Sequence, residues 1–530
     1  MYKRGLAIVV ITCLGLMLAC GVIAQTTQIN VTIREARIVV DPMIYGQMLE
    51  NVNDSVIYKG VVNEDGTVRT HLIPLLKDLN IPVMRWPGGT VIHEYRWREG
   101  VGPKALRPVV KTHAWHGKET YQFGTDEFLQ WCKDVGTTPY LNFNMANDAT
   151  HGGTLGEALN WVEYVNGSSD TTNYGKLRAA YGHKAPYNVK YWCIGNENYG
   201  PWGTHTAETA SDYGDRLKYW AGAINKSFPG LSLLAIGHTL HWNKTVLEKA
   251  GTEIDYLTQH YYVTSRFKNG VTEAPYNALF APLKMEKHLQ LLGADLKNYN
   301  NLYRKNKNGV QLSIDEWNNR HSVFDGKDYK FSRQDPRRQL DATIAAGMLN
   351  VFIRNCDIVG MANYIFPVNG HGLIRTVGNT DAFKTPLFYL FKKYRESMTG
   401  EKLDITVEGP GIAASTIQPT IDGDSKEVTL DNRLLTFIDA AATRSSDGAI
   451  NVALTNRSKD QKQKIRIQVP KGYYLSGKWE LTGKTINDFN DADRRDGIVP
   501  KITSYTGKQG QNNLAMEPCA VVVLRFEALK

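Results

Sequence analysis

Two stretches decide the fold, VKYWCIGNE at residues 189–197 and VQLSIDEW at residues 310–317. Each is a short apolar run that ends in a glutamate, Glu197 in the first and Glu316 in the second. Six more short apolar runs lie between residues 43 and 399, and all eight alternate with amphipathic helical stretches. Eight strands, each followed by a helix, are typical of a (β/α)8 barrel. A doubly wound sheet shows the same alternation, but no glycine-rich dinucleotide turn follows the first strand. The prediction is therefore an α/β fold, a closed (β/α)8 TIM barrel.

The expected elements follow from hydrophobic periodicity and from capping residues. The eight strands are expected at residues 44–50, 83–87, 139–144, 189–197, 231–237, 254–262, 310–317 and 358–367. Helices are expected at residues 124–135, 154–165, 206–227, 243–250, 275–296, 339–355 and 385–397. Thr154 and Asn243 offer N-cap side chains, and Pro386 stands where a first helical residue would.

The pattern changes near Gly400. From there to Lys530 no convincing helix is found, and β-rich runs are separated by Gly, Asn and Asp turns. Strands are expected at residues 403–407, 434–439, 449–455, 464–469, 474–480 and 520–526. This pattern predicts a C-terminal all-β sandwich, jelly-roll-like, over residues 400–530. Residues 25–42 contain a strand that joins this sandwich, so the barrel occupies residues 43–399.

The first residues have the pattern of an export signal. Lys3 and Arg4 precede an uncharged run from residue 6 to residue 20, and small residues up to Ala24 offer a cleavage site. This predicts a signal peptide at residues 1–24. The alternative is a lipoprotein, because the residues before Cys20 resemble a bacterial lipobox. The expected location is the periplasm or cell surface of a bacterium. No later segment is long and apolar enough to span a membrane.

Composition excludes several classes of function. The 530 residues carry a formal net charge of +9 but no Lys/Arg block, so a nucleic-acid role has little support. Six cysteines are too sparse for a disulfide scaffold, and no CxxC spacing indicates zinc. No phosphate loop or nicotinamide fingerprint is present, so neither a cofactor nor a metal is expected. Most of the four cysteines after residue 24 are expected to be buried small hydrophobes: Cys132, Cys193, Cys356 and Cys519.

Glu197 ends the fourth strand and Glu316 ends the seventh. Catalytic groups of a barrel stand at the C-terminal ends of its strands, so both carboxylates are expected in one mouth. Retaining glycoside hydrolysis needs a carboxylic acid that protonates the leaving oxygen and a carboxylate that attacks the anomeric carbon, ~5–5.5 Å apart. Trp192 and Trp317 supply apolar surface nearby, and Asn196 is placed to bind a sugar hydroxyl. The pair predicts a glycosidase.

The motifs around this pair resemble those of glycoside hydrolase family 51, the α-L-arabinofuranosidases of clan A. The resemblance covers most of residues 40–400 and continues into the tail with LTNR at residues 454–457. It is carried, in order, by RWPGG at 85–89, YRW at 95–97, GVGP at 100–103, GNE at 195–197, GPW at 200–202, HYY at 260–262 and DEWN at 315–318. It implies a retaining, exo-acting arabinofuranosidase on plant polysaccharide or oligosaccharide. The expected partners are arabinose-containing glycans. A homo-oligomer is compatible with the resemblance, but the sequence fixes no oligomeric state.

The resemblance also implies residue roles. Glu197 is the general acid/base and Glu316 the nucleophile, which forms a covalent glycosyl–enzyme intermediate. Asn196 contacts the 2-hydroxyl, and Tyr262 positions or tunes the nucleophile. The remaining members of the expected sugar site are His260 in the same pocket, Glu50 as a sugar-binding glutamate, Arg85 in the charge network of the nucleophile, and Trp202 as a stacking platform. Each has a plainer alternative: Arg85 a buried ion-pair partner, His260 a packed core residue, Glu50 a loop cap, and Trp202 a core residue.

Three positions depart from the family pattern. Thr90 and Asn51 stand where the family has Asn and His, and the alignment puts Gly360 at a substrate-binding Gln. The segments 147–153 with His151 and 366–376 with His371 are expected to fill the vacated space. These departures leave open a clan A glycosidase of other specificity, a β-xylosidase or an endoglucanase. A non-catalytic glycan-binding barrel is the third hypothesis, although binding alone has no need for both glutamates.

Overall fold

The computed structural model describes residues 26–305, 308–419, 421–423, 427–506 and 513–529. The expected signal peptide at residues 1–24, Cys20 included, lies outside these ranges. Among the described helices, none has the length and apolar character that crossing a bilayer requires.

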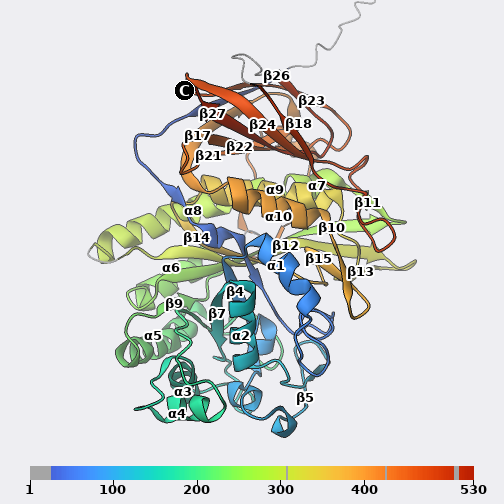
Figure 1. Ribbon diagram of the computed structural model, residues 1–530. Coiled ribbons are helices and arrows are strands. Elements are labelled where there is room, and N and C mark those ends of the chain that lie inside the picture. Colours follow the sequence, from blue (N-terminus) through green and yellow to red (C-terminus); the bar gives the residue numbers. More distant parts are fainter. Residues whose placement is uncertain (1–25, 306–307, 420, 424–426, 507–512, 530) are drawn as a thin grey trace, which may run out of the picture.

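Eight parallel strands close into a barrel, as predicted. Each strand pairs with the next around the ring, and the last pairs with the first. The strands are β3 (Gly46–Met48), β4 (Val83–Trp86), β7 (Thr138–Phe143), β8 (Tyr191–Ile194), β9 (Ser232–Ala235), β10 (Tyr256–Lys268), β12 (Gln311–Phe324) and β14 (Val359–Tyr364). In Figure 1 the barrel forms the lower part of the molecule.

Helices lie outside the barrel where periodicity placed them, with two additions. The additions are α1 (Ile73–Leu79) and α4 (Asn173–Ala180), which are too short to show a clear period in sequence. The stretch expected as one helix at 275–296 is two, because the chain breaks at Phe280 before Pro282. The expected helices are α2 (Thr125–Val135), α3 (Leu155–Asn166), α5 (Ala210–Ser227), α6 (Leu240–Ala250), α7 (Pro275–Leu279), α8 (Ala281–Tyr303), α9 (Gln339–Arg354) and α10 (Pro386–Ser397).

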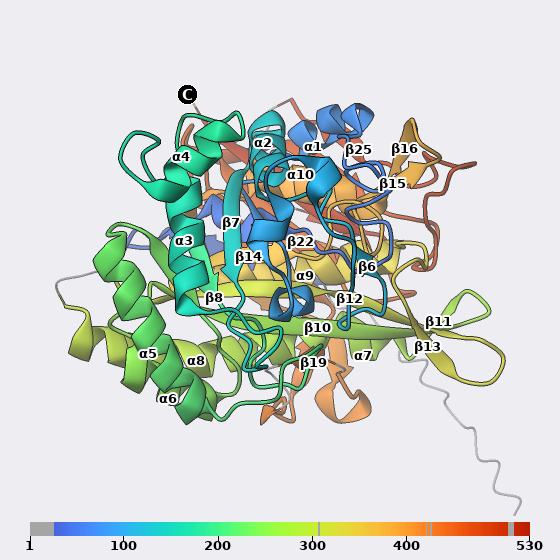
Figure 2. The same cartoon turned by 90° about the horizontal axis from the view of Figure 1, so that it is seen from below.

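Strands β10 and β12 run well past the ends that the sequence predicted at residues 262 and 317. They stay paired from Tyr256↔Gln311 to Phe267↔Val323. Each then turns back as a hairpin, β10 with β11 (Val271–Glu273) and β12 with β13 (Tyr329–Ser332). The apolar runs end at the mouth, so hydrophobic periodicity does not indicate that β10 and β12 continue beyond it. Figure 2 shows both long strands extending from the barrel to one side, toward β11 and β13.

The C-terminal part is a β-sandwich with its own core of aliphatic and aromatic side chains, among them Ile29, Val452 and Phe526. Strand β1 (Thr27–Thr32) lies between β17 and β23, antiparallel to the first and parallel to the second. The other strands are β2 (Val39–Val40), β17 (Gly400–Glu408), β21 (Ile438–Arg444), β22 (Ile450–Asn456), β23 (Gln463–Gln468), β24 (Tyr473–Leu481), β25 (Lys501–Ser504), β26 (Asn513–Met516) and β27 (Val521–Ala528).

Helices α9 and α10 lie between the barrel and the sandwich (Figure 1). Asn350 of α9 donates to Asp439 of β21 at 2.9 Å, and Arg354 forms an ion pair with the same carboxylate at 3.1 Å. A second contact comes from β19 (Ile421–Gly423), which pairs antiparallel with β10 at Tyr261–Val263. A short strand from the C-terminal part of the chain is therefore added to the extension of β10 beside the mouth. The remaining short strands are β5 (Val110–Lys111), β6 (Lys118–Glu119), β15 (Ile374–Val377), β16 (Asp381–Lys384), β18 (Gly411–Ala413) and β20 (Leu434–Thr436).

Candidate active site

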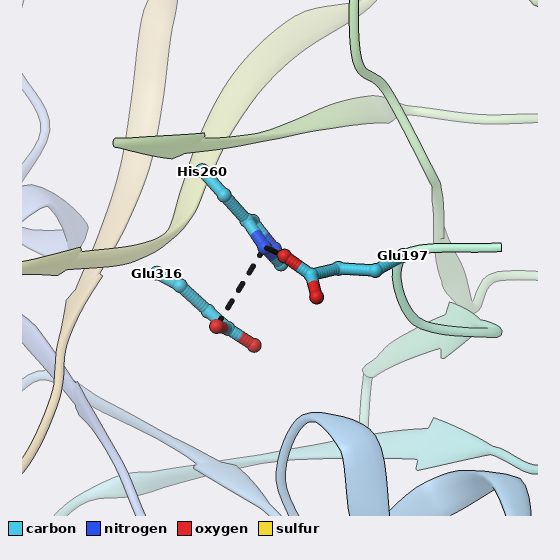
Figure 3. A group of neighbouring side chains, drawn as sticks. All are labelled: Glu197, His260 and Glu316. Carbon is cyan, nitrogen blue, oxygen red and sulfur yellow. Dashed lines mark hydrogen bonds and ion pairs between the residues drawn. The ribbon is translucent and has the colours of Figure 1, made fainter. Parts of the chain in front are cut away.

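Glu197, His260 and Glu316 meet at the C-terminal mouth of the barrel, with one carboxylate oxygen of each glutamate and a ring nitrogen of His260 all within 4.8 Å of one another. Figure 3 shows the imidazole between the two carboxylates. Retaining glycosidases hold their carboxylates ~5–5.5 Å apart, whereas inverting enzymes leave ~6.5–9.5 Å for a water molecule. The spacing is that of a retaining enzyme.

Glu316 is held as a fixed carboxylate inside β12. The side chain is buried, and Nη1 of Arg85 donates to its Oε1 at 2.8 Å. The hydroxyl of Tyr262 donates to Oε2. With both oxygens accepting hydrogen bonds, the carboxylate has one orientation and a cationic partner, which suits a nucleophile that must be ionised.

Arg85 of β4 connects the nucleophile to its surroundings. It is fully buried, and its Nε lies 3.3 Å from Asp315 directly beneath Glu316. Its Nη2 donates to Oδ1 of Asn196 at 2.7 Å. The amide Nδ2 of Asn196 is buried and has no partner among the described residues. That donor therefore remains available to a ligand in the pocket, because an unpaired buried donor is otherwise costly.

Glu197 stands on a tight turn after β8. Its φ of 43° is left-handed, a conformation uncommon for a residue with a side chain. The turn is fixed by Asn198, whose Oδ1 accepts from the Asn196 backbone N–H at 3.1 Å. Gly195 leaves room for that amide, since a Cβ there would lie 2.2 Å from the same oxygen. The GNE motif thus directs Glu197 into the mouth.

The proton of the acid/base is shared with a histidine. Nδ1 of His260 lies 2.8 Å from Oε1 of Glu197 and 3.6 Å from Oε2 of Glu316. Burial alone would lower the pKa of His260, but the charge of Glu316 and the contact with Glu197 outweigh it and raise the pKa to about 9. Burial would likewise raise the pKa of Glu197, yet the hydrogen bond and charge of His260 bring it below its usual value. Both shifts favour an ion pair between a protonated His260 and an ionised Glu197.

Glu50 lies near Glu316, on the other side of the Gly89 backbone. Its Oε1 accepts from the Val91 backbone N–H at 3.2 Å and from the Trp115 indole at 2.9 Å. Burial, followed by repulsion from Glu316, raises the pKa of Glu50 to about 7. Near neutral pH this carboxyl is partly protonated and can both donate to and accept from a sugar hydroxyl.

The glycines of the WPGG motif at residues 86–89 bring the backbone against both carboxylates. Gly88 has φ 125°, and a Cβ on it would lie 2.5 Å from the Glu50 side chain. A Cβ on Gly89 would lie 2.7 Å from Oε1 of Glu316 and 3.2 Å from Oε2 of Glu50. Only glycine leaves the floor between these two carboxylates open.

The structure corrects one of the three departures from the family pattern. Gly360 does not lie at the mouth. It is the second residue of β14, and a Cβ there would meet Gln311 and Tyr256, the first residues of β12 and β10. Because parallel strands start at the same end, Gly360 lies at the opposite end of the barrel from the catalytic pair. The alignment was wrong by about one strand length.

The other departures lie near the mouth. The amide of Asn51 is engaged by Glu119 at 2.9 Å and by the Lys118 carbonyl at 3.2 Å. Thr90 is half-buried and begins a 3-10 turn, Thr90–His93, next to Gly89. Its methyl group would lie 3.5 Å from a Cβ on Gly203, in the loop after Glu197.

Three other predicted residues are not joined to the catalytic pair by any contact in the described part of the chain. Trp202 is 43% exposed, and its carbonyl contacts Nδ1 of His93 at 2.9 Å. His151 pairs with Asp148 at 2.8 Å. His371 is buried with its ring 5.7 Å from that of Phe331. Of these, only Trp202 is exposed enough to offer a stacking surface.

Several side chains of the site were missed in sequence. They are Asn198 and Tyr199, which contact the Glu197 turn, Trp115, which binds Glu50, and Arg320, which stacks on Tyr262. Asn198 and Tyr199 directly follow the GNE motif, so adjacency was a usable signal. Trp115 and Arg320 reach the mouth from a loop and a strand extension, for which the sequence gives no periodic signal.

Glu197, His260 and Glu316 are also the one group with metal-site spacing among the described residues. A cation there would meet the Arg85 guanidinium 2.8 Å from Glu316 and a protonated His260. These positive charges disfavour a metal, while they suit two carboxylates that react directly with a sugar.

A closed (β/α)8 barrel with two carboxylates at this spacing defines the class as a retaining glycoside hydrolase. The alpha-L-arabinofuranosidase 1 domain family matches residues 75–278, and the alpha-L-arabinofuranosidase C-terminal domain family matches residues 315–519. The chain belongs to the α-L-arabinofuranosidases of glycoside hydrolase family 51. All four cysteines after residue 24 are buried and free, where burial of most of them was expected.

Relatives of known name cover nearly the whole chain. It is 32% identical to the probable alpha-L-arabinofuranosidase C of Aspergillus niger, over 88% of this chain and 91% of the relative. It is 28% identical to an intracellular exo-alpha-L-arabinofuranosidase of Bacteroides ovatus, over 90% of each. The solved alpha-L-arabinofuranosidase of Thermotoga maritima, in complex with arabinose, superposes with a TM-score of 0.80 at 28% identity, covering 95% of this chain and 99% of that one. These comparisons do not favour the glycan-binding or other-specificity hypotheses.

Proposed function

We propose that the protein removes terminal α-L-arabinofuranosyl units from arabinose-containing oligosaccharides or polysaccharides with retention of configuration. The observation that carries this is the spacing of Glu197 and Glu316, whose nearest oxygens lie within 4.8 Å. That distance leaves no space for a water molecule between sugar and carboxylate, so Glu316 itself is the group that attacks.

In the first step an oxygen of Glu316 forms a bond to the anomeric carbon, and the bond to the leaving oxygen breaks. Glu197 gives that oxygen its proton, so the aglycone departs as a neutral alcohol. The proton comes from the Glu197–His260 pair. Substrate that fills the mouth excludes water and favours the neutral carboxylic acid over the ion pair, which moves the proton onto Glu197.

In the second step Glu197, now a carboxylate, takes a proton from water as its oxygen attacks the anomeric carbon. The bond to Glu316 breaks, and arabinose leaves with the starting configuration. Arg85 and Tyr262, which donate to Glu316 in the free enzyme, stabilise the carboxylate as it is released. The unpaired Nδ2 of Asn196 is the donor for the 2-hydroxyl, a contact that strengthens in the transition state.

Glu50 is the second sugar-binding carboxyl in this proposal, and His260 is the proton partner. Trp202 is a platform for the aglycone, supported only by its exposure and its place in the loop after Glu197. Exo action is supported by the name of the Bacteroides ovatus relative.

Release of nitrophenol from aryl glycosides tests the proposal, with the α-L-arabinofuranoside, β-xyloside and β-glucoside side by side. The arabinofuranoside is expected to react, with the first-formed arabinose in the α configuration by NMR. Turnover of only another glycoside would overturn the specificity, and a β product would overturn the mechanism. Digestion of an arabinose-containing polysaccharide in the same series then shows whether single arabinose units are the only products.

We also propose that residues 1–24 direct export. Support comes from Lys3 and Arg4 ahead of an uncharged run. Mass spectrometry of the mature protein from fractionated cells distinguishes cleavage before Gln25 from lipid attachment at Cys20. An intact N-terminus in the cytoplasmic fraction would overturn export, and the intracellular name of one relative makes this control necessary.

A further inference from the structure

An arginine without a carboxylate partner faces the catalytic mouth. Arg320 is half-buried on the extension of β12, and within the described residues its guanidinium forms no ion pair and no hydrogen bond. The guanidinium instead stacks on an aromatic ring: its carbon lies 3.3 Å from the centre of the Tyr262 ring. Arginine stacked on an aromatic face keeps its N–H edge free for a planar anion.

The strand places this arginine on the catalytic side. Trp317 and Asn319 point outward, the first to Phe352 of α9 and the second to Asp341 of the same helix. Alternation along β12 therefore puts Glu316, Asn318 and Arg320 on the inner face. Asn318 is buried, and its Oδ1 has no partner within the described residues.

Arg320 belongs to a row in which arginines and aromatic rings alternate: Tyr262, Arg320, Phe331, Arg333 and Trp115. Phe331 of β13 is 49% exposed, and its ring centre lies 6.0 Å from the Arg320 guanidinium and 4.8 Å from that of Arg333. Arg333 in turn lies 4.3 Å from the Trp115 ring. Both ends of the row bind pocket carboxylates, Tyr262 to Glu316 and Trp115 to Glu50. The row is thus a rim around one side of the mouth.

The rim is positively charged on the side next to Glu197, the proposed acid/base. Arg333 is offset by Asp54 at 2.9 Å, whereas Arg320 has no such partner in the part of the chain that the structure describes. The charge of Arg320 also acts on Glu197, where it helps to lower the pKa of the carboxyl. In the proposed mechanism Glu197 protonates the departing oxygen, so a leaving group held at Glu197 also lies within the field of the Arg320 charge.

We propose that Arg320 selects substrates whose leaving group carries a carboxylate, that is, arabinofuranosyl units attached to uronate-bearing glycans. This inference rests on the proposed function and adds to it a preference for a negatively charged aglycone. The carboxylate binds the open N–H edge of Arg320, which Tyr262 and Phe331 hold in place by stacking.

Two matched aryl α-L-arabinofuranosides test it, one with a 4-carboxyphenyl and one with the neutral, similarly shaped 4-carbamoylphenyl leaving group. The readout is the ratio of their kcat/KM values, because a change in the pKa of Glu197 alters both rates together. The wild type is expected to prefer the carboxylate. Arg320→Met should reduce the ratio by about tenfold, chiefly through KM, as expected for a lost charge-assisted hydrogen bond.

Two further variants act as controls. Arg320→Lys keeps the charge and should retain part of the preference, and Arg466→Met removes a charge from the exposed face of β23 and should leave the ratio unchanged. A wild-type ratio near one, or a ratio that Arg320→Met does not change, overturns the inference while the enzyme still cleaves both substrates. If neither substrate is cleaved, the proposed function itself fails and the inference with it.

Discussion

The turn after β8 and the strand β12 present the two proposed catalytic carboxylates in opposite ways. Glu197 is on a left-handed turn, half-buried, beside a histidine that holds a proton. Glu316 is inside a continuous strand, buried, and fixed by Arg85 and Tyr262. The group that stays ionised is thus fixed by a strand and a permanent cation. The group that changes its protonation state stands on a turn next to a titrating partner.

Removing the two carboxylates should have the largest and most distinct effects. Glu316→Ala is expected to lose about 10⁵-fold or more in kcat/KM on an aryl arabinofuranoside, because no covalent intermediate forms. Glu197→Ala should lose about 10²–10⁴-fold, since a good leaving group needs less protonation. Steady-state kinetics with purified, folded variants measures both.

Azide separates the two roles further. With Glu197→Ala, azide should restore turnover and give a glycosyl azide of retained configuration. Azide attacks the covalent glycosyl–enzyme intermediate in place of water and needs no general base. With Glu316→Ala it can give only the inverted azide. A retained azide from Glu316→Ala would show that the assignments of nucleophile and acid/base are reversed.

Activity should depend strongly on the exact geometry of the cation beside Glu316, which is Arg85. Arg85→Lys cannot serve Glu316, Asp315 and Asn196 together, so we expect about a 100-fold loss in kcat. Stability should fall by about 3 kcal/mol, because buried carboxylates lose partners. Arg178→Lys is the control, since Arg178 is equally buried but donates to backbone carbonyls near α4. Arg178→Lys should also lose stability in denaturant unfolding, but its kcat should stay near that of the wild type. Equal kcat losses in both would mean that Arg85 acts only through stability.

The turn region should control the alkaline limit of activity. In the wild type, the pair loses its proton at the raised pKa of His260, about 9, so the basic limb of kcat/KM lies at high pH. In His260→Gln the proton can reside only on the Glu197 carboxyl, which titrates at lower pH. The basic limb should therefore move down by about two pH units. An unchanged basic limb would place the titrating acid elsewhere.

The smallest expected effect comes from the tyrosine beside the turn. Tyr199 donates to Oε1 of Glu197 at 3.0 Å. Tyr199→Phe removes one hydrogen bond worth about 1 kcal/mol, so kcat/KM should fall about fivefold. The variant should keep the basic limb of the wild type. A shift as large as that of His260→Gln would make Tyr199, not His260, the main partner of Glu197.

The sequence predicted what short-range patterns determine. The eight barrel strands and the change to a sandwich near Gly400 follow from period and length. Glu197 and Glu316 follow from their position at strand ends. The structure brings Glu50, Arg85, Asn196, His260 and Tyr262 to the same mouth, and Asn196 stands next to Glu197 in the chain itself.

What the sequence did not predict depends on tertiary contacts. Strand β12 continues to Phe324 because β10 and β13 pair with it, although its apolar run ends at Trp317. Arg320 on that extension therefore had no place in the expected site. Gly360 was misplaced for the opposite reason. The apolar run at 358–367 does not show where β14 itself begins and ends, and Gly360 lies at its N-terminal end, away from the mouth.

Strand β1 has a consequence for how the chain is made. It pairs with β17 and with β23, and β23 begins at Gln463. At a synthesis rate of roughly 10 residues per second, residues 27–32 wait on the order of 40 s before their second partner leaves the ribosome. During that time the strand exposes unpaired backbone, and the barrel between the two has already been made. The pairing of β1 with β23 therefore joins segments from near the two ends of the chain, so a tag or truncation at residues 27–32 disturbs the sandwich as directly as one in β23.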